Sequence, residues 1–217
     1  MHKNVHNLTL INNQIKLKFG LLENLNIIAV SKTFSIDKID PLIDYGHIHF
    51  GENKVQEAET KWSLFKKTNQ EVKLHMIGKL QSNKAKKAIE LFDYIHSLDN
   101  KKLADTLSKN ESILNKNLKY FIQVNIGNEN QKSGILPSDL DNFFTYCTKE
   151  KNLNVIGLMA IPPNDNNTRK YFQYLSEANA SLELPELSIG MSSDYKTALD
   201  FKASFLRIGS LIFGPRN

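Results

Sequence analysis

Short apolar runs alternate with helix-like segments along the whole chain, and this alternation limits the possible folds more than any other feature of the sequence. Eight runs have the length and composition of buried strands: residues 26–32, 47–52, 73–78, 94–98, 119–126, 155–161, 186–191 and 205–209. Between them, apolar residues recur at three- and four-residue intervals, the spacing of a helix that buries one face. Strict alternation of strands and helices predicts a parallel sheet with right-handed crossovers.

The number of strand–helix units selects among the parallel-sheet folds. Eight units in 217 residues predict an α/β fold of the (β/α)8 TIM barrel type, with a single domain over residues 1–217. An open doubly wound sheet is the alternative, but no G-x-G-x-x-G motif follows the first predicted strand.

The two ends of the chain modify the simplest barrel. Eight residues follow the eighth predicted strand, which are too few for a final helix. We therefore expect an amphipathic N-terminal helix to cover the last strand; its apolar side is formed by Val5, Leu8, Ile11, Ile15 and Phe19. The helix after the sixth strand is expected to be short.

Composition argues against several kinds of partner. The formal charge of +5 is spread along the chain, and its one short basic cluster, "NKAKKA" at 83–88, has no RNA-binding signature beside it, so we expect no nucleic-acid partner. Cys147 is the only cysteine, and no Cys/His cluster has metal-ligand spacing. No apolar run approaches the length of a membrane span, and the N-terminus is too polar for a signal peptide. We expect a cytoplasmic protein that contacts neither membrane nor metal.

Polar residues stand at the C-terminal ends of several predicted strands, where TIM barrels carry their functional groups. Lys32 follows the buried run "NIIAVS" directly. A lysine in such a desolvated place can form a Schiff base with a carbonyl, although Lys32 taken alone fits better a lysine whose ammonium reaches solvent at a strand end.

The last two strand ends predict a phosphate site. Gly190, Ser192 and Ser193 follow the seventh strand, while Gly209 and Ser210 follow the eighth. Loops at these positions of a barrel often bind phosphate through backbone N–H groups. A Schiff-base lysine and a phosphate site together call for a ligand with an aldehyde and a phosphate, and pyridoxal 5'-phosphate (PLP) has both.

Arg207 then acquires a function at the pyridine nitrogen of that cofactor. It lies on the eighth predicted strand, and arginine can only donate hydrogen bonds. A ring nitrogen that accepts from arginine stays unprotonated, which makes the cofactor a poor electron sink.

At this point the chain resembles a known family, the pyridoxal phosphate homeostasis proteins, which share the alanine racemase-like barrel. The resemblance covers nearly the whole chain and follows seven blocks in order. They are "AVSKT" from Ala29, "HFGENKVQEA" from His49, "HMIGKLQSNK" from His75, "IQVNI" from Ile122 with "KSG" from Lys132, "GLMAIPP" from Gly157, "LSIGMSSD" from Leu187 and "LRIGSLIFGPR" from Leu206.

The resemblance implies a set of cofactor-binding residues and no catalytic ones. Lys32 matches the family's cofactor lysine and Arg207 the partner of the ring nitrogen, while the phosphate positions match Ser192, Gly209 and Ser210. Asn53 and Met159 match residues that line the pocket. Lys132 matches a recurring second lysine with no assigned role. Two departures are small: Ile189 stands where Met is usual, and Ser210 replaces a common Thr.

The family's lack of a clear enzymatic activity implies a protein that holds PLP for vitamin B6 homeostasis and delivers it, with PLP-dependent apoenzymes as the implied recipients. We expect a monomer or a weak homodimer. A small PLP-dependent amino-acid racemase is the first alternative; it would need a second base, for which Lys132 and Tyr195 are the candidates. A class I aldolase is the second, in which the lysine would hold the substrate and no cofactor.

Overall fold

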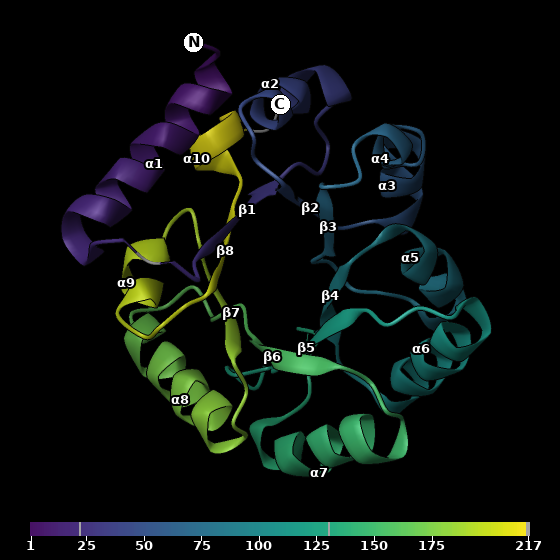
Figure 1. Ribbon diagram of the computed structural model, residues 1–217. Helices are drawn as coiled ribbons and strands as arrows, with labels where there is room; N and C mark the ends of the chain where they lie inside the picture. The colour runs from purple at the N-terminus through teal and green to yellow at the C-terminus, as the bar shows by residue number, and fades with distance from the viewer. Residues whose placement is uncertain (22, 130, 216–217) are drawn as a thin grey trace.

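Eight parallel strands close into a barrel in the computed structural model, which describes residues 1–21, 23–129 and 131–215. Each strand pairs with its sequence neighbours, and β1 pairs with β8 to complete the ring (Figure 1). The strands are β1 (Asn26–Val30), β2 (His49–Glu52), β3 (Lys73–Met76), β4 (Tyr94–Leu98), β5 (Lys119–Gln123), β6 (Val155–Met159), β7 (Glu186–Met191) and β8 (Phe205–Ile208). The predicted TIM barrel is confirmed.

Several strands end earlier than the sequence predicts, always at the end that carries the polar residues. The first predicted strand runs to residue 32, but β1 ends at Val30; β3 likewise ends at Met76 rather than at residue 78. The apolar pattern continues past the last ladder hydrogen bond because the outgoing loops still bury side chains at the mouth of the barrel.

Helices surround the barrel and bury their apolar faces against it (Figure 1). Their bounds are α2 (Ile36–Asp44), α3 (Val55–Trp62), α4 (Phe65–Thr68), α5 (Ala85–Leu91), α6 (Lys101–Leu114), α7 (Leu140–Thr145), α8 (Thr168–Ser181), α9 (Tyr195–Leu199) and α10 (Ser210–Phe213). A π-helical turn over Tyr146–Glu150 extends α7. The expectation of a short helix after the sixth strand was wrong, because α8 has 14 residues.

The N-terminal helix α1 (Lys3–Phe19) covers the side of the barrel where β8 meets β1, as predicted (Figure 1). It packs against α10 and α2. Asn7 Nδ2 donates to the carbonyl oxygen of Ile212 at 2.9 Å, and Asn4 Nδ2 donates to that of Lys38 at 2.8 Å. These bonds connect the start of the chain to α10 and to α2. The expectation that no helix follows the eighth strand was wrong, because α10 forms a four-residue helix there.

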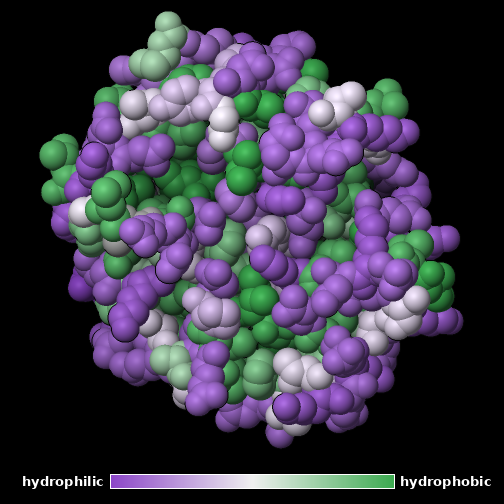
Figure 2. All heavy atoms as spheres, in the orientation of Figure 1, coloured by the Kyte–Doolittle hydropathy of each residue, from purple (hydrophilic) through white to green (hydrophobic). Residues whose placement is uncertain are grey.

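The core has two layers. The larger lies between strands and helices, while the inside of the barrel holds a separate apolar cluster of Ile28, Tyr94, Phe121, Met159 and Phe205. Hydrophilic residues cover most of the surface in the space-filling view, with apolar side chains visible in the hollows between them (Figure 2). Among the described residues, no helix has the length and apolarity needed to cross a membrane.

Candidate functional site

A cavity of about 480 Å³ lies at the C-terminal mouth of the barrel. Its walls come from the ends of six strands and the loops after them: Val30, Lys32, Asn53, Ile77, Gly78, Ile161, Met191, Ser192, Ser193, Arg207, Gly209 and Ser210. Six of the seven residues predicted to bind a cofactor are in this group. The barrel brings them together because the C-terminal ends of parallel strands all open on the same face.

Lys32 stands two residues beyond β1, half-buried at the wall of the cavity. The residue before it is tied down: Ser31 Oγ donates to Glu52 Oε1 at 2.7 Å, and Lys61 Nζ donates to the carbonyl oxygen of Ser31 at 2.9 Å. The residue after it, Thr33, has a φ of 69°, a left-handed conformation that a β-branched residue rarely adopts. The backbone on both sides of Lys32 is therefore fixed in one conformation.

Glu52 is the centre of this support, a role that was not predicted from the sequence. Its Oε1 also accepts from Lys61 Nζ at 2.9 Å and from Trp62 Nε1 at 3.0 Å. The carboxylate is fully buried, and Lys61 is 9% exposed. A buried acid on a strand, followed nine and ten residues later by Lys and Trp, is the sequence signal that could have indicated the cluster.

Arg207 points from β8 into the barrel and is 4% exposed. Its Nη1 donates to the carbonyl oxygen and the Oγ of Ser188, at 2.6 and 2.8 Å, and its Nη2 donates to the carbonyl oxygen of Ala160 at 2.9 Å. Burial lowers the pKa of the guanidinium to about 10, partly offset by the charge of Asp194. These bonds use three of the five N–H donors of an arginine, so two are left for the cavity that it lines.

The two C-terminal loops are connected through Ser192. Its Oγ accepts from the backbone N–H of Gly209 at 3.3 Å and of Leu211 at 3.4 Å. Gly190 makes the preceding turn with a φ of +91°, and a Cβ there would lie 2.6 Å from the Cβ of Ala198. Glycine is therefore required at 190, and the loop it starts comes directly against the beginning of α10.

Asn53 and Gly78 form the opposite wall. A Cβ at Gly78 would lie 2.4 Å from the backbone oxygen of Asn53, so the loops after β2 and β3 can approach this closely only with glycine. The Oδ1 of Asn53 is buried and has no hydrogen-bond partner in the part of the chain that the structure describes. A buried acceptor at a cavity wall calls for a donor from whatever fills the cavity.

Met159 is the predicted site residue that lies elsewhere. It is fully buried inside the barrel, in the apolar cluster with Phe121 and Phe205, and it does not line the cavity. Side chains two residues apart on a strand share a face. Ile161, two positions further on, lies at the level of the cavity instead.

Lys132 lines a neighbouring cavity of about 300 Å³, which shares Ile77, Gly78 and Ile161 with the first. Its Nζ donates to the carbonyl oxygen of Pro162 at 3.2 Å and pairs with Glu129. Tyr195 lies on the outer side, where its hydroxyl donates to Gln14 Oε1 of α1 at 2.8 Å. Neither residue lines the cavity that contains Lys32.

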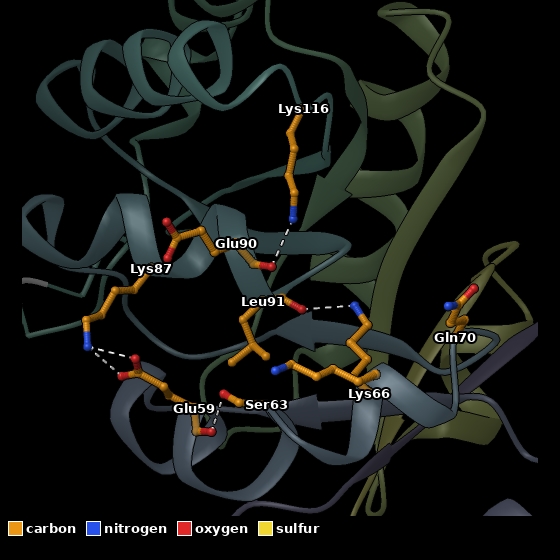
Figure 3. A pocket seen from close by; sticks show the side chains of 9 residues that line it. Glu59, Ser63, Lys66, Gln70, Lys87, Glu90, Leu91 and Lys116 are labelled. Atoms are coloured by element: carbon orange, nitrogen blue, oxygen red, sulfur yellow. Dashed lines mark hydrogen bonds and ion pairs between the residues drawn. The ribbon is translucent and has the colours of Figure 1, made fainter.

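A third cavity, of about 410 Å³, is lined by lysines of α4, α5 and the loop before β5 (Figure 3). Lys66 Nζ donates to the carbonyl oxygen of Leu91, and Lys116 Nζ to that of Glu90, so both lysines satisfy carbonyls at the C-terminal end of α5. Lys87 pairs with Glu59. The ammonium groups of Lys66, Lys87 and Lys116 therefore make contacts that stabilise the fold. The described residues also contain no group of His, Cys, Asp or Glu placed to hold a metal ion.

The fold and this cavity first identify the class of protein. Residues 6–217 match the family model described as alanine racemase, N-terminal domain. The alanine racemase of Corynebacterium glutamicum has the same fold, with a TM-score of 0.73 at 17% identity, over 99% of this chain and 61% of that one.

Curated relatives then specify the family. A pyridoxal phosphate homeostasis protein of Aquifex aeolicus is 38% identical over 88% of this chain and 86% of its own length, and one of Haemophilus influenzae is 35% identical over 98% and 95%. PipY of Synechococcus elongatus, solved with PLP bound, superposes with a TM-score of 0.86 at 32% identity, over 97% of this chain and all of that one. This chain belongs to the pyridoxal phosphate homeostasis protein family, as its motifs predicted.

Proposed function

We propose that this protein binds PLP in the cavity of about 480 Å³, with Lys32 joined to the cofactor as a Schiff base, and that it serves vitamin B6 homeostasis by holding and delivering PLP. The observation that carries the proposal is the convergence of Lys32, Arg207 and the Ser192–Gly209 loop pair on one cavity. PipY, a relative with the same barrel, was solved with PLP bound.

The residues present fit this cofactor in size and chemistry. The cavity lies within the range of about 300–1,000 Å³ that small-molecule sites occupy. It contains an amine at Lys32, spare donors at Arg207 and a buried acceptor at Asn53 to which none of the described residues donates. When bound, PLP supplies an aldehyde that condenses reversibly with amines.

Each residue then has a defined task toward PLP. Lys32 provides the amine, on a backbone held by Glu52 and Lys61. Arg207 donates to the ring nitrogen and, having no acceptor, keeps that nitrogen free of a proton. Ser192, Gly209 and Ser210 surround the phosphate with hydroxyls and backbone N–H groups, which bind anions well. Asn53 accepts a hydrogen bond at the opposite wall.

The arrangement supports holding PLP rather than transforming it. Racemisation needs an acid–base group on each side of the substrate's α carbon, and Lys32 supplies one. The two candidates for the other, Lys132 and Tyr195, lie outside this cavity and bond to Glu129 and Gln14. Met159 would contribute only through packing inside the barrel, beneath the cavity. The proposed setting is the cytoplasm, with a single PLP-binding domain that passes its cofactor to apoenzymes.

An absorbance spectrum before and after borohydride reduction, followed by mass mapping of the modified peptide, tests this function. We expect visible absorbance in the protein loaded with PLP and a pyridoxyl group on Lys32 after reduction. Lys32→Ala should abolish both, and Lys38→Ala, a change at an exposed residue of α2, should abolish neither. A pyridoxyl group mapped to another lysine would contradict the site.

The racemase alternative has its own test. The loaded protein is incubated with L-amino acids in deuterated water, and exchange at the α carbon is followed. We expect no exchange above that of Lys32→Ala. Exchange that depends on Lys32 would show an enzyme.

A further inference from the structure

Three histidines and a serine run through the inside of the barrel in one line of hydrogen bonds that ends at Arg207. Arg207 Nη1 donates to Ser188 Oγ at 2.8 Å, and Ser188 Oγ lies 2.9 Å from His96 Nδ1. His96 Nε2 lies 2.9 Å from His75 Nδ1, and His75 Nε2 lies 2.9 Å from His49 Nδ1. The line thus runs from the cavity to the first residue of β2, at the other end of the barrel.

The rings in this line are neutral. His75 and His96 are fully buried, and burial holds the pKa of each well below its ordinary value. The charge of Arg207 lowers the pKa of His96 further, and a proton on His96 would repel one on His75, which lowers the pKa of His75 as well. His49 is half-buried, and burial together with Lys73 lowers its pKa to about 4.

Neutral rings allow only two arrangements of the hydrogens. A neutral imidazole has one N–H donor and one acceptor nitrogen. At each 2.9 Å contact between rings, one partner must donate and the other accept. If one ring were turned against the others, two donors or two lone pairs would face each other in a buried place, at a cost of about 1–3 kcal/mol or more. All three rings must therefore carry the proton on Nε2, or all three on Nδ1.

The position of Arg207 determines which of these two proton arrangements is more favourable. With the protons on Nε2, the Ser188 hydroxyl donates to His96 Nδ1, while its oxygen accepts from Arg207. The lone pair of His96 then faces the buried cation, which is electrostatically favourable. With the protons on Nδ1, His96 would point its N–H toward the guanidinium, and the Ser188 hydrogen would need another acceptor.

We propose that Ser188, His96, His75 and His49 form one ordered hydrogen-bond chain, with every ring protonated on Nε2, and that this chain positions Arg207 for the pyridine nitrogen of PLP. The part concerning PLP rests on the proposed function. The ordered chain keeps the Ser188 oxygen available to Arg207, whose spare N–H donors then stay directed at the cavity. The proton position on His49, at the far end of the chain, is coupled to that on His96 beside Arg207, because no ring can change its tautomer alone.

The first test needs no cofactor. Long-range ¹H–¹⁵N NMR of the apo protein labelled at histidine distinguishes Nε2–H from Nδ1–H for each ring. We expect His49, His75 and His96 all to be in the Nε2–H form. One ring in the Nδ1–H form would overturn the proposed order, and so would a charged ring at pH 8.

The second test asks whether the chain positions Arg207. His96→Phe keeps a flat ring against Phe121, whose ring is stacked at 4.2 Å, but breaks the chain. We expect about tenfold weaker PLP binding, the effect of weakening one charge-assisted hydrogen bond. The ¹⁵N shift of the bound pyridine nitrogen should move toward that of a free pyridine. His96→Gln, which can accept from Ser188 and donate to His75, should restore both readouts.

The control is Phe205→Leu, which removes an aromatic ring that packs against all three histidines but takes away no hydrogen bond of the chain. It should leave the pyridine shift unchanged. Equal shifts in His96→Phe and Phe205→Leu would refute a positioning role. If the wild type shows the Nε2 order but takes up no PLP, the proposed function and the role toward the ring nitrogen fail together, while the hydrogen order stands.

Discussion

Lowering the pH from 7 to 5 should destabilise this protein strongly, because its interior histidines are neutral. In the unfolded chain a histidine takes up a proton near pH 6.5. His75 and His96 are fully buried, and their lowered pKa values keep them neutral in the folded state over this range. The unfolded state therefore binds more protons below pH 6.5, so folding stability is present above that pH and falls as the pH drops.

The magnitude follows from this difference. A histidine that stays neutral while folded loses about 2 kcal/mol of stabilisation between pH 7 and pH 5, so His75 and His96 together lose about 4 kcal/mol. His47 and His49, whose pKa values are both lowered to about 4, add to this loss, to a smaller extent because both are partly exposed. The whole stability of a domain is only about 5–15 kcal/mol.

Urea unfolding at half-unit steps from pH 7 to pH 5 measures the effect. Trp62, the single tryptophan, is fully buried and reports unfolding by fluorescence. His96→Gln should remove about 2 kcal/mol of the pH-dependent loss, since one proton site disappears. His2→Gln, at an exposed residue, should leave the loss unchanged. The reasoning fails if the wild type and His96→Gln lose the same stability between pH 7 and pH 5.

Three further changes test the fold and the site. Gly157→Ala should lower the free energy of unfolding by about 3 kcal/mol in urea titrations, because a Cβ there would meet the carbonyl oxygen of Glu186 at 2.1 Å; a loss under 1 kcal/mol would contradict this. Glu52→Gln should cost about 3 kcal/mol by the same measurement, the low end of the range for a broken buried ion pair, since it removes the nearer partner of Lys61 and leaves, among the described residues, only Glu57 at 3.5 Å; an unchanged midpoint would refute it. Arg207→Lys should weaken PLP binding about tenfold in absorbance titrations, because lysine lacks the planar donor fork; equal affinity would argue against the ring-nitrogen contact.

The sequence was sufficient to predict where one set of polar residues would gather. Lys32, Ser192, Gly209 and Ser210 stand at or just beyond predicted strand ends, and in a parallel barrel all such ends open on one face. That step needs only the order of strands and helices. The order of strands and helices does not predict how high along the barrel axis a side chain lies, because that level depends on how neighbouring strands are staggered. Met159 was placed at the wrong level for this reason, although its strand and its face are evident from the sequence.

By itself, then, the sequence determined the barrel, the covering N-terminal helix and the residues at its mouth, because periodicity and chain order are local properties. Only the tertiary structure decided what fills the interior. The contact between His96 and Ser188 joins residues 92 positions apart across the barrel. Whether two inward side chains meet there depends on strand stagger and on the volumes of all the others, which no local pattern records.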